Sequence, residues 1–328
     1  MSKKNIAIVT TGGTIAAHHP NQTHLGDYVV EQSAHDLIAA VPGLTDLATL
    51  TLHEVSHIDS RNMSFAIQHR LIQTVQQLVD QDTVDGVVIT HGTDTLEETA
   101  LLLHWCIKSP KPVVVTGAMR PASALSADGP LNLYHAVLTA CTEAAQGLGT
   151  LVLMNDQLFS ARFVQKTHTS MPDAFGAPAA GALGLVSQGR VYIHHAPRPA
   201  FGKACALQLP ATPHLPRVDL IYDYVDAPLA LYQAAVDTGA QALVIAAVGN
   251  GSLSPSARAG ALYAAEKGVL CVRASRIPNG PVAPSEQDKR YHTLPAYQFS
   301  ALAARSLCAL ALAQSADRQQ IHHYLQHY

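Results

Sequence analysis

The stretch Val87–Thr99 constrains the fold of this chain more than any other. It opens with a β-branched run that is typical of a buried strand. Gly92 then allows a sharp turn, and Thr95 with Glu98 makes the capping-box pattern that predicts the start of a helix. Polar side chains are thus held where a strand ends and a helix begins, which is the usual ligand position in an open α/β sheet.

Strand and helix patterns alternate along the rest of the chain as well. The alternation predicts an α/β fold with parallel sheets, divided into two domains. We predict a larger N-terminal catalytic domain with an α/β sheet over residues 1–196, and a smaller C-terminal parallel-sheet α/β domain over residues 218–328. Residues 197–217 contain several prolines and few charges, and we interpret them as the linker.

The composition narrows the class of protein. The chain has 328 residues, of which 48% are hydrophobic and 14% charged, as expected of a globular protein rather than a disordered one. The net charge of -3 and the lack of a long basic run give no sign of nucleic acid or an anionic membrane as partner. No apolar stretch of the sequence reaches membrane-spanning length.

The N-terminus and the cysteines bear on the compartment. A core-like strand follows the first five residues directly, without a hydrophobic signal segment, so we expect a cytoplasmic protein. A chain from which a signal peptide had been removed would look the same, and would then be periplasmic. The five cysteines are scattered and form no C-x-x-C pair, which indicates reduced thiols rather than a disulfide framework or a metal site.

A threonine follows a Gly-Gly turn after the first predicted strand, Ile6–Thr10. Thr14 comes directly after Gly12 and Gly13, so we expect its hydroxyl to be exposed, with room for a substrate beside it. This is a good position for a nucleophile, although a plain turn threonine is the alternative interpretation. The glycines form neither G-x-G-x-x-G nor a phosphate-binding loop, so nucleotide binding has little support.

The segment His53–His57 matches H-E-x-x-H, the string typical of zinc proteases. That chemistry needs a helix, because the two histidines must share one face to bind one ion. The flanking residues alternate like a strand over 48–58, and in a strand the histidines would lie roughly 13 Å apart. We therefore predict no metal site. A zinc peptidase that uses His53 and His57 is the alternative, and a metal assay with a chelator would test it.

Five polar segments lie at predicted strand ends or helix starts of the first domain: 11–16, 59–63, 88–99, 117–121 and 128–132. With them the sequence resembles the bacterial L-asparaginase/glutaminase family of threonine amidohydrolases. The resemblance is close in Thr-Gly-Gly-Thr-Ile-Ala, in Thr-His-Gly-Thr-Asp-Thr-Leu-Glu-Glu-Thr, in Gly-Ala-Met-Arg-Pro and in Ser-Ala-Asp-Gly-Pro-Leu-Asn-Leu. It continues through 154–156, 248–251 and 317–328, and so covers essentially the whole chain.

The resemblance implies catalytic roles for four residues. Thr14 would be the nucleophile, and Thr93, Asp94 and Lys166 would form the second catalytic group. A lysine amine acts as a base only when it is neutral, and Asp94 beside it favours the charged form. We therefore expect Lys166 to orient Thr93 more than to remove a proton. Backbone N–H groups at the turn of Gly92 and Thr93, near a helix N-terminus, suit the oxyanion formed on attack.

The resemblance also implies contacts to the substrate and between subunits. Ser60 would bind the α-carboxylate, Asp94 the α-ammonium, and the carbonyl of Ala118 the amide NH2 of the substrate. Ser252 and, after an offset of one residue, Glu286 would be contributed to the site of a neighbouring subunit. The active assembly would be a homotetramer, built as a dimer of dimers.

The sequence departs from the family pattern at three places. Arg61 stands where the family usually has Gln or Glu, and a cation close to a bound α-ammonium is unfavourable. Arg61 could point away, pair with an acid, or bias substrate choice. Tyr28 is the nearest candidate for the loop tyrosine of the family, although an ungapped match puts Asp27 there. The positions of the disulfide of some periplasmic members are not cysteine.

We therefore expect hydrolysis of L-asparagine to L-aspartate and ammonia through an aspartyl ester, without a metal or cofactor. Activity on L-glutamine is left open by the sequence. The alternative in a different class is a non-catalytic amino-acid sensor on the same scaffold, which Arg61 makes conceivable.

Overall fold

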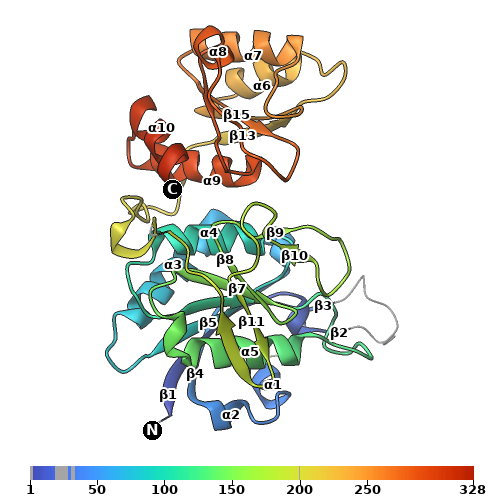
Figure 1. Ribbon diagram of the computed structural model, residues 1–328, viewed down its shortest axis with the longest axis vertical. Coiled ribbons are helices and arrows are strands. Elements are labelled where there is room, and N and C mark those ends of the chain that lie inside the picture. The colour runs from blue at the N-terminus through green and yellow to red at the C-terminus, as the bar shows by residue number, and fades with distance from the viewer. Residues whose placement is uncertain (1–2, 19–28, 31–33, 199) are drawn as a thin grey trace. The chain divides into compact units, whose positions relative to one another are not determined.

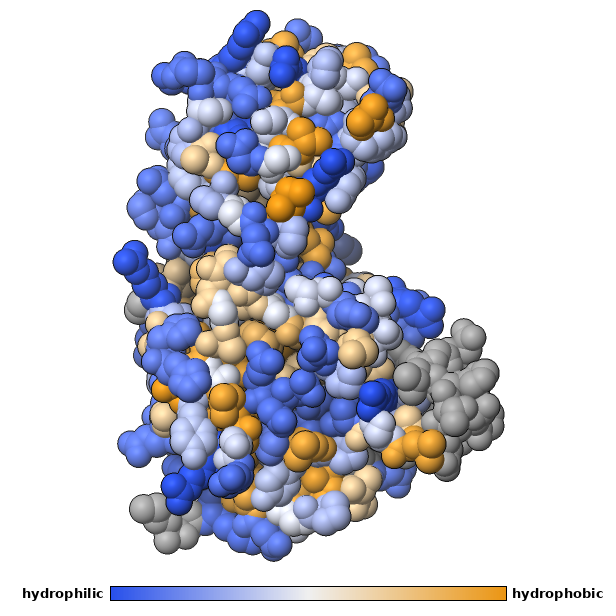
Figure 2. Space-filling view, turned by 45° about the vertical axis from the view of Figure 1, so that its right-hand side comes forward, coloured by the Kyte–Doolittle hydropathy of each residue, from blue (hydrophilic) through white to orange (hydrophobic). Residues whose placement is uncertain are grey.

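The computed structural model describes residues 3–18, 29–30, 34–198 and 200–328 (Figure 1). The chain divides into two compact units, Met1–Ala206 and Leu207–Tyr328. The boundaries of the linker at 197–217 stay a prediction. In the described part of the chain, no helix is both long and apolar enough to cross a membrane. On the face that Figure 2 shows, hydrophobic side chains lie in small groups among hydrophilic ones in each unit.

The first unit is built on an eight-stranded sheet in the order β12-β11-β8-β7-β6-β5-β1-β4. The strands are β1 (Lys4–Gly12), β4 (Ala48–Ile58), β5 (Gly86–Thr90), β6 (Val113–Thr116), β7 (Thr150–Met154), β8 (Gln157–Ser160), β11 (Gly184–Ser187) and β12 (Arg190–Ile193). Strands β4, β1, β5, β6 and β7 are parallel, whereas β8, β11 and β12 join antiparallel. Two short ribbons lie outside this sheet, β2 (Ala17–His18) with β3 (Val29–Val30), and β9 (Gln165–Lys166) with β10 (Phe175–Gly176).

The expectation of a parallel sheet was wrong for β8, β11 and β12. Two tight hairpins reverse the chain there, one between β7 and β8 and one between β11 and β12. Asn155 and Asp156 have φ of 48° and 66°, and Gln188 and Gly189 have φ of 49° and 70°. Two successive residues with positive φ are the mark of the turns that connect antiparallel strands. The Asn-Asp pair was the local signal for this reversal.

Helices cover the sheet on both faces. They are α1 (Ala34–Ala39), α2 (Leu44–Leu47), α3 (Phe65–Val79), α4 (Leu96–Cys106) and α5 (Gly129–Cys141). Alternate strand residues such as Ile6 and Ile8 are buried in one core with Leu133 and Val137 of α5. Side chains at successive strand positions point to opposite faces, so Ala7 and Val9, also buried, face the other side. This double covering explains why the central strands are hydrophobic along their whole length.

The second unit confirms the predicted parallel sheet. Its four strands lie in the order β13 (Val218–Tyr222), β14 (Ala242–Ala247), β15 (Leu270–Ser275) and β16 (Thr293–Pro295), all parallel. The helices are α6 (Ala230–Asp237), α7 (Pro255–Glu266), α8 (Glu286–Arg290), α9 (Ala301–Ala313) and α10 (Arg318–His327). Strand β16 ends at Pro295, and helix α9 begins at Ala301, where the side chain of Ser300 caps it by accepting the N–H of Ala303.

The contact between α6 and α7 yields a test of the packing. A Cβ on Gly260 of α7 would lie 2.3 Å from Cγ of Tyr232, which is fully buried on α6. We predict that Gly260→Ala lowers the free energy of unfolding by about 1–3 kcal/mol, measured by urea denaturation. Alanine favours an exposed helix by about 1 kcal/mol over glycine, so a rise in stability would contradict the packing. Ala259→Ser, at an exposed neighbour, should stay within about 0.5 kcal/mol of wild type.

Candidate active site

The polar segments of the first unit meet at the carboxyl ends of four neighbouring parallel strands. These strands lie in the order β6-β5-β1-β4. Gly117 follows β6, His91 follows β5, Gly13 follows β1 and Asp59 follows β4. Because parallel strands end at the same edge of the sheet, loops from four separate parts of the sequence are brought together.

Close backbone contacts hold these loops against one another. A Cβ on Gly13 would lie 2.4 Å from both Cα and N of Gly92. A Cβ on Gly92 would in turn lie 2.6 Å from Oγ of Ser60. Gly12 and Gly13 have φ of 98° and 87°, a region that favours glycine. The sequence has glycine at these positions because a side chain would separate the segments that carry the predicted site.

Thr14 lies between two of these contacts. Its preceding neighbour, Gly13, packs on Gly92, and a Cβ on Gly129 of α5 would lie 2.8 Å from Cγ1 of Ile15, its following neighbour. Thr14 is only 3% exposed, so the expectation of an exposed hydroxyl was wrong. The close packing of the Gly-Gly turn on neighbouring loops is the physical reason.

Lys166 joins the site from 73 residues away in the sequence. Its Nζ donates to Oγ1 of Thr93 at 3.0 Å and to Oδ1 of Asp94 at 2.6 Å. Thr93 is 5% exposed, whereas the Asp94 side chain is 46% exposed. Since the Thr93 oxygen accepts from the lysine, its own proton is free to point elsewhere. The arrangement orients the Thr93 hydroxyl.

Ser60 connects the end of β4 to the start of α4. Its Oγ accepts the backbone N–H of Asp94 at 3.3 Å, and its carbonyl accepts the hydroxyl of Thr95 at 3.0 Å. Helix α4 begins at Leu96 as predicted, but the capping box was wrong, because the Thr95 side chain makes no cap hydrogen bond. The hydroxyl of Thr95 is used for the contact with Ser60 instead.

Arg61 forms an ion pair at the edge of this site. Its Nη2 lies 3.0 Å from Oδ2 of Asp59, and its side chain is 73% exposed. The side-chain hydrogen bond from Arg61 lowers the pKa of Asp59. Of the outcomes left open by the sequence, pairing with an acid is the one observed. The carboxylate of Asp59 offsets part of the positive charge beside the predicted ammonium position.

A partly buried carboxylate and a buried amide support the loop that contains Ala118. Asp128 accepts the backbone N–H groups of Met119 and Arg120, each at 2.9 Å. The amide nitrogen of Asn132 donates to the carbonyl of Gly117 at 3.0 Å. Sequence reasoning gave no role to Asp128 and Asn132, although both lie in a motif of the resemblance. Their spacing of four residues on one helical turn was the available signal.

The strand predicted across the H-E-x-x-H string is confirmed. His53 and His57 both lie in β4, where four residues separate them along an extended chain. Within residues 3–18, 29–30, 34–198 and 200–328, no group of three or more His, Cys, Asp or Glu side chains could hold a metal ion.

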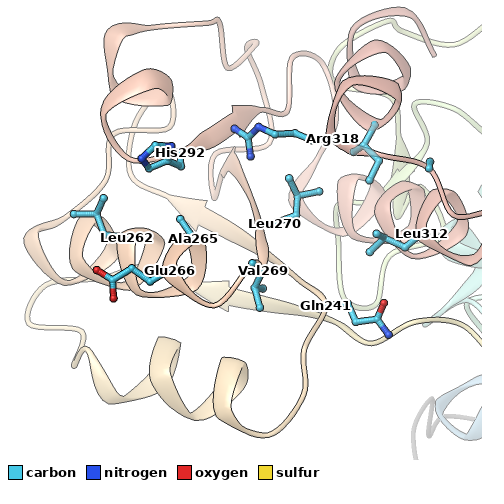
Figure 3. Close-up of a pocket in the computed structure, with 12 residues that line it drawn as sticks. Gln241, Leu262, Ala265, Glu266, Val269, Leu270, His292, Leu312 and Arg318 are labelled. Carbon is cyan, nitrogen blue, oxygen red and sulfur yellow. The ribbon is translucent and has the colours of Figure 1, made fainter.

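One cavity lies away from all the predicted residues (Figure 3). It has a volume of about 620 Å³, and its lining includes Gln241, Leu270, His292 and Arg318. Gln241 immediately precedes β14 and Leu270 opens β15, so the cavity lies at the amino ends of the parallel strands. Ligands of open α/β sheets bind at the carboxyl ends, so the loops around Thr93 stay the candidate site.

Comparison with known proteins decides the family. Residues 5–199 match the model of the N-terminal asparaginase domain, and residues 217–325 match the Glutaminase/Asparaginase C-terminal domain. The chain belongs to the asparaginase family. The prediction that it is an enzyme of the asparaginase class is confirmed.

Full-length relatives share this assignment. The chain is 40% identical over 325 residues to L-asparaginase 2 of Bacillus subtilis, covering 99% of this chain and 86% of that protein. It is 37% identical over 326 residues to L-asparaginase 2 of Escherichia coli, covering 99% and 93%. A crystal structure of a probable cytoplasmic L-asparaginase from Campylobacter jejuni superposes with a TM-score of 0.96 at 38% identity, covering 99% of this chain and all of that one.

Three more residues implied by the asparaginase resemblance lie elsewhere. Tyr28 falls outside the described residues. Ser252 and Glu286 both belong to the second unit, and a buried arginine links the two segments that contain them. Arg273 donates to the carbonyls of Asn250 and Gly251 on one loop, and to Asp288 on α8, which begins at Glu286.

Gly92 yields a test of the asparaginase site packing. We predict that Gly92→Ala lowers the free energy of unfolding by about 1–3 kcal/mol, because the new Cβ would overlap Ser60. Gly176→Ala is the matched control, since its Cβ would meet no atom closer than 3.6 Å. Equal stability of the two variants in chemical denaturation would contradict the packing.

His91 yields a prediction about pH. Burial lowers its pKa from 6.5 to about 4, while its Nδ1, 2.7 Å from the carbonyl of Gly92, donates to that oxygen. The unfolded chain takes up a proton at His91 as the pH falls below 6.5, whereas the folded chain does so only near 4. Stability therefore falls through that window, by up to about 3 kcal/mol from this residue.

The measurement is chemical denaturation at several pH values between 7 and 4. We expect His91→Gln to lose less stability than wild type over this range. Buried His104, whose pKa is lowered to about 3, is present in both proteins and cancels in the comparison. Parallel stability curves for the two proteins would show that His91 does not carry this linkage.

Proposed function

We propose that this chain hydrolyses L-asparagine to L-aspartate and ammonia with Thr14 as nucleophile. The observation that carries the proposal is the contact of Lys166 with both Thr93 and Asp94, at the strand ends beside the turn of Thr14. Membership of the asparaginase family and the names of the relatives support the same reaction.

The chemistry follows from the positions of the groups. The hydroxyl oxygen Oγ1 of Thr14 attacks the side-chain amide carbon of asparagine. The oxyanion that forms accepts hydrogen bonds from the backbone N–H groups at the turn of Gly92 and Thr93. The C–N bond then breaks, and the nitrogen leaves as ammonia with the proton from Thr14. Water adds to the remaining aspartyl ester, which releases aspartate and restores the hydroxyl.

The substrate contacts are proposed on the same geometry. Ser60 receives the α-carboxylate, Asp94 the α-ammonium, and the carbonyl of Ala118 the amide NH2. The pairing of Arg61 with Asp59 reduces the repulsion that a free guanidinium would exert on the ammonium. L-Glutamine, one methylene longer, is proposed as a slower second substrate, in keeping with the description of the C-terminal domain.

We further propose a homotetramer, a dimer of dimers in which Ser252 and Glu286 complete the site of a neighbouring subunit. Arg273 supports this arrangement, because one buried guanidinium joins the loop before Ser252 to helix α8, which begins at Glu286. We place the protein in the cytoplasm, as described for the Campylobacter neighbour. A periplasmic location would follow if a signal peptide had preceded this sequence.

The direct test is ammonia release from L-asparagine by purified protein. We predict that Thr14→Ala and Thr93→Ala each lower kcat by at least about 10³-fold, as for loss of a nucleophile or its partner. Thr74→Ala on α3 is the control, because its hydroxyl donates to the carbonyl of Arg70 away from the site. Wild-type turnover in either site variant would contradict the assignment.

Two results would favour other functions. Tight binding of L-asparagine without ammonia release would favour the amino-acid sensor. Peptide hydrolysis that disappears with a chelator and returns with zinc would favour a peptidase.

The shared site is tested by mixing subunits. Thr14→Ala leaves the second unit intact, and a Ser252→Ala/Glu286→Ala double variant leaves the first unit intact. We predict that co-expressed mixed oligomers regain activity that neither variant has alone, because one pairing joins two intact halves. If mixed oligomers form but stay inactive, each site is built within one subunit.

A further inference from the structure

Glu97 reaches from helix α4 to the segment that contains Lys166. It lies in the first turn of α4, three residues after Asp94. Its Oε2 accepts the backbone N–H of Lys166 at 2.6 Å, across 69 residues of sequence. The same lysine donates from its side chain to Thr93 and Asp94. Lys166 is therefore bound at its backbone N–H by helix α4 and at its side-chain amine by the turn that precedes this helix.

The segment of Lys166 has little other regular support. Strand β9 has two residues and, in the part of the chain that the structure describes, pairs only with the two-residue strand β10, outside the eight-stranded sheet. A ribbon of this size is marginal without further packing. When Glu97 is ionised, its hydrogen bond with the backbone N–H of Lys166 is about twice as strong as one between neutral groups. Glu97 therefore supplies a strong contact at the point where the lysine leaves the backbone.

We propose that Glu97 is a positioning residue of this active site, whose carboxylate fixes the backbone of Lys166 so that its amine reaches Thr93. The inference rests on the proposed function, because Lys166 matters only if Thr93 acts in the reaction. It goes beyond that function by assigning a role to a residue outside the threonine, aspartate and lysine set.

A simpler explanation is that Glu97 only stabilises the N-terminus of α4. Acidic side chains in the first turn interact favourably with the helix dipole. Glu98 is the adjacent acidic residue of that turn and shares this effect, but Lys166 N–H is bound by Glu97. The two neighbours therefore separate positioning from helix stabilisation.

The charges around Glu97 add a second observable. Burial raises its pKa to about 7, and the negative charge of Glu98 also raises it, whereas the N–H and the charge of Lys166 lower it. Asp94 is the other carboxylate bound to that lysine. The folded protein thus holds a proton on Glu97 that the unfolded chain releases near 4.5. The stability that this bound proton gives the folded protein is lost as the pH rises from about 4.5 through 7.

The experiment measures steady-state ammonia release from L-asparagine for wild type, Glu97→Ala, Glu97→Gln and Glu98→Ala. We expect Glu97→Ala to lower kcat by about 10-fold to 100-fold with KM little changed, as for a misplaced catalytic group. Glu97→Gln should restore most of kcat, because its amide oxygen can still accept the N–H of Lys166. Glu98→Ala should behave as wild type.

A wild-type kcat in Glu97→Ala would overturn the proposal, as would an equal loss in Glu98→Ala or a failure of Glu97→Gln to restore turnover. If the alanine variant does not fold, thermal unfolding of wild type and Glu97→Gln at pH 5 and pH 8 provides a second test. Wild type should lose more Tm between these values than Glu97→Gln, and an equal loss would also count against the proposal. An inactive wild type would instead refute the proposed function itself.

Discussion

The contact between Gly13 and Gly92 is the constraint on which the site depends. Two adjacent parallel strands, β1 and β5, each end in a turn whose backbone packs on the other without a side chain between them. This places the threonine that follows each glycine at the same edge of the sheet. A sheet edge provides the common direction, but the short approach requires glycine on both strands.

The electrostatic arrangement is built on the same edge. The carboxylate of Asp94 accepts from the amine of Lys166, and the carboxyl group of the partly buried Glu97 accepts from the backbone N–H of the same lysine. The amine of Lys166 donates to both Thr93 and Asp94, and its role as the group that orients Thr93 stays a prediction. Arg61, the residue expected to disturb this balance, has its own carboxylate partner in Asp59.

Local pattern was enough to predict the elements that form the site, because each loop follows a β-branched strand and precedes a recognisable helix start. It was not enough where the decisive contact is distant in sequence. The hydroxyl of Thr95 fits a capping box locally, yet it donates to Ser60 in the structure. Likewise no local pattern connects Glu97 with Lys166. The antiparallel strands were missed because two-residue turns, rather than the strands themselves, set their direction.

The central claim is that Thr14 attacks the substrate while Thr93 and Lys166 assist. Its most direct test is to quench the wild-type reaction with acid in the first turnovers and locate the aspartyl ester by mass spectrometry. Trypsin separates the two threonines, since Thr14 lies in peptide 5–61 and Thr93 in peptide 71–108. We predict an added aspartyl group on Thr14, absent from Thr14→Ala. An ester on Thr93 that forms at the rate of ammonia release would contradict it.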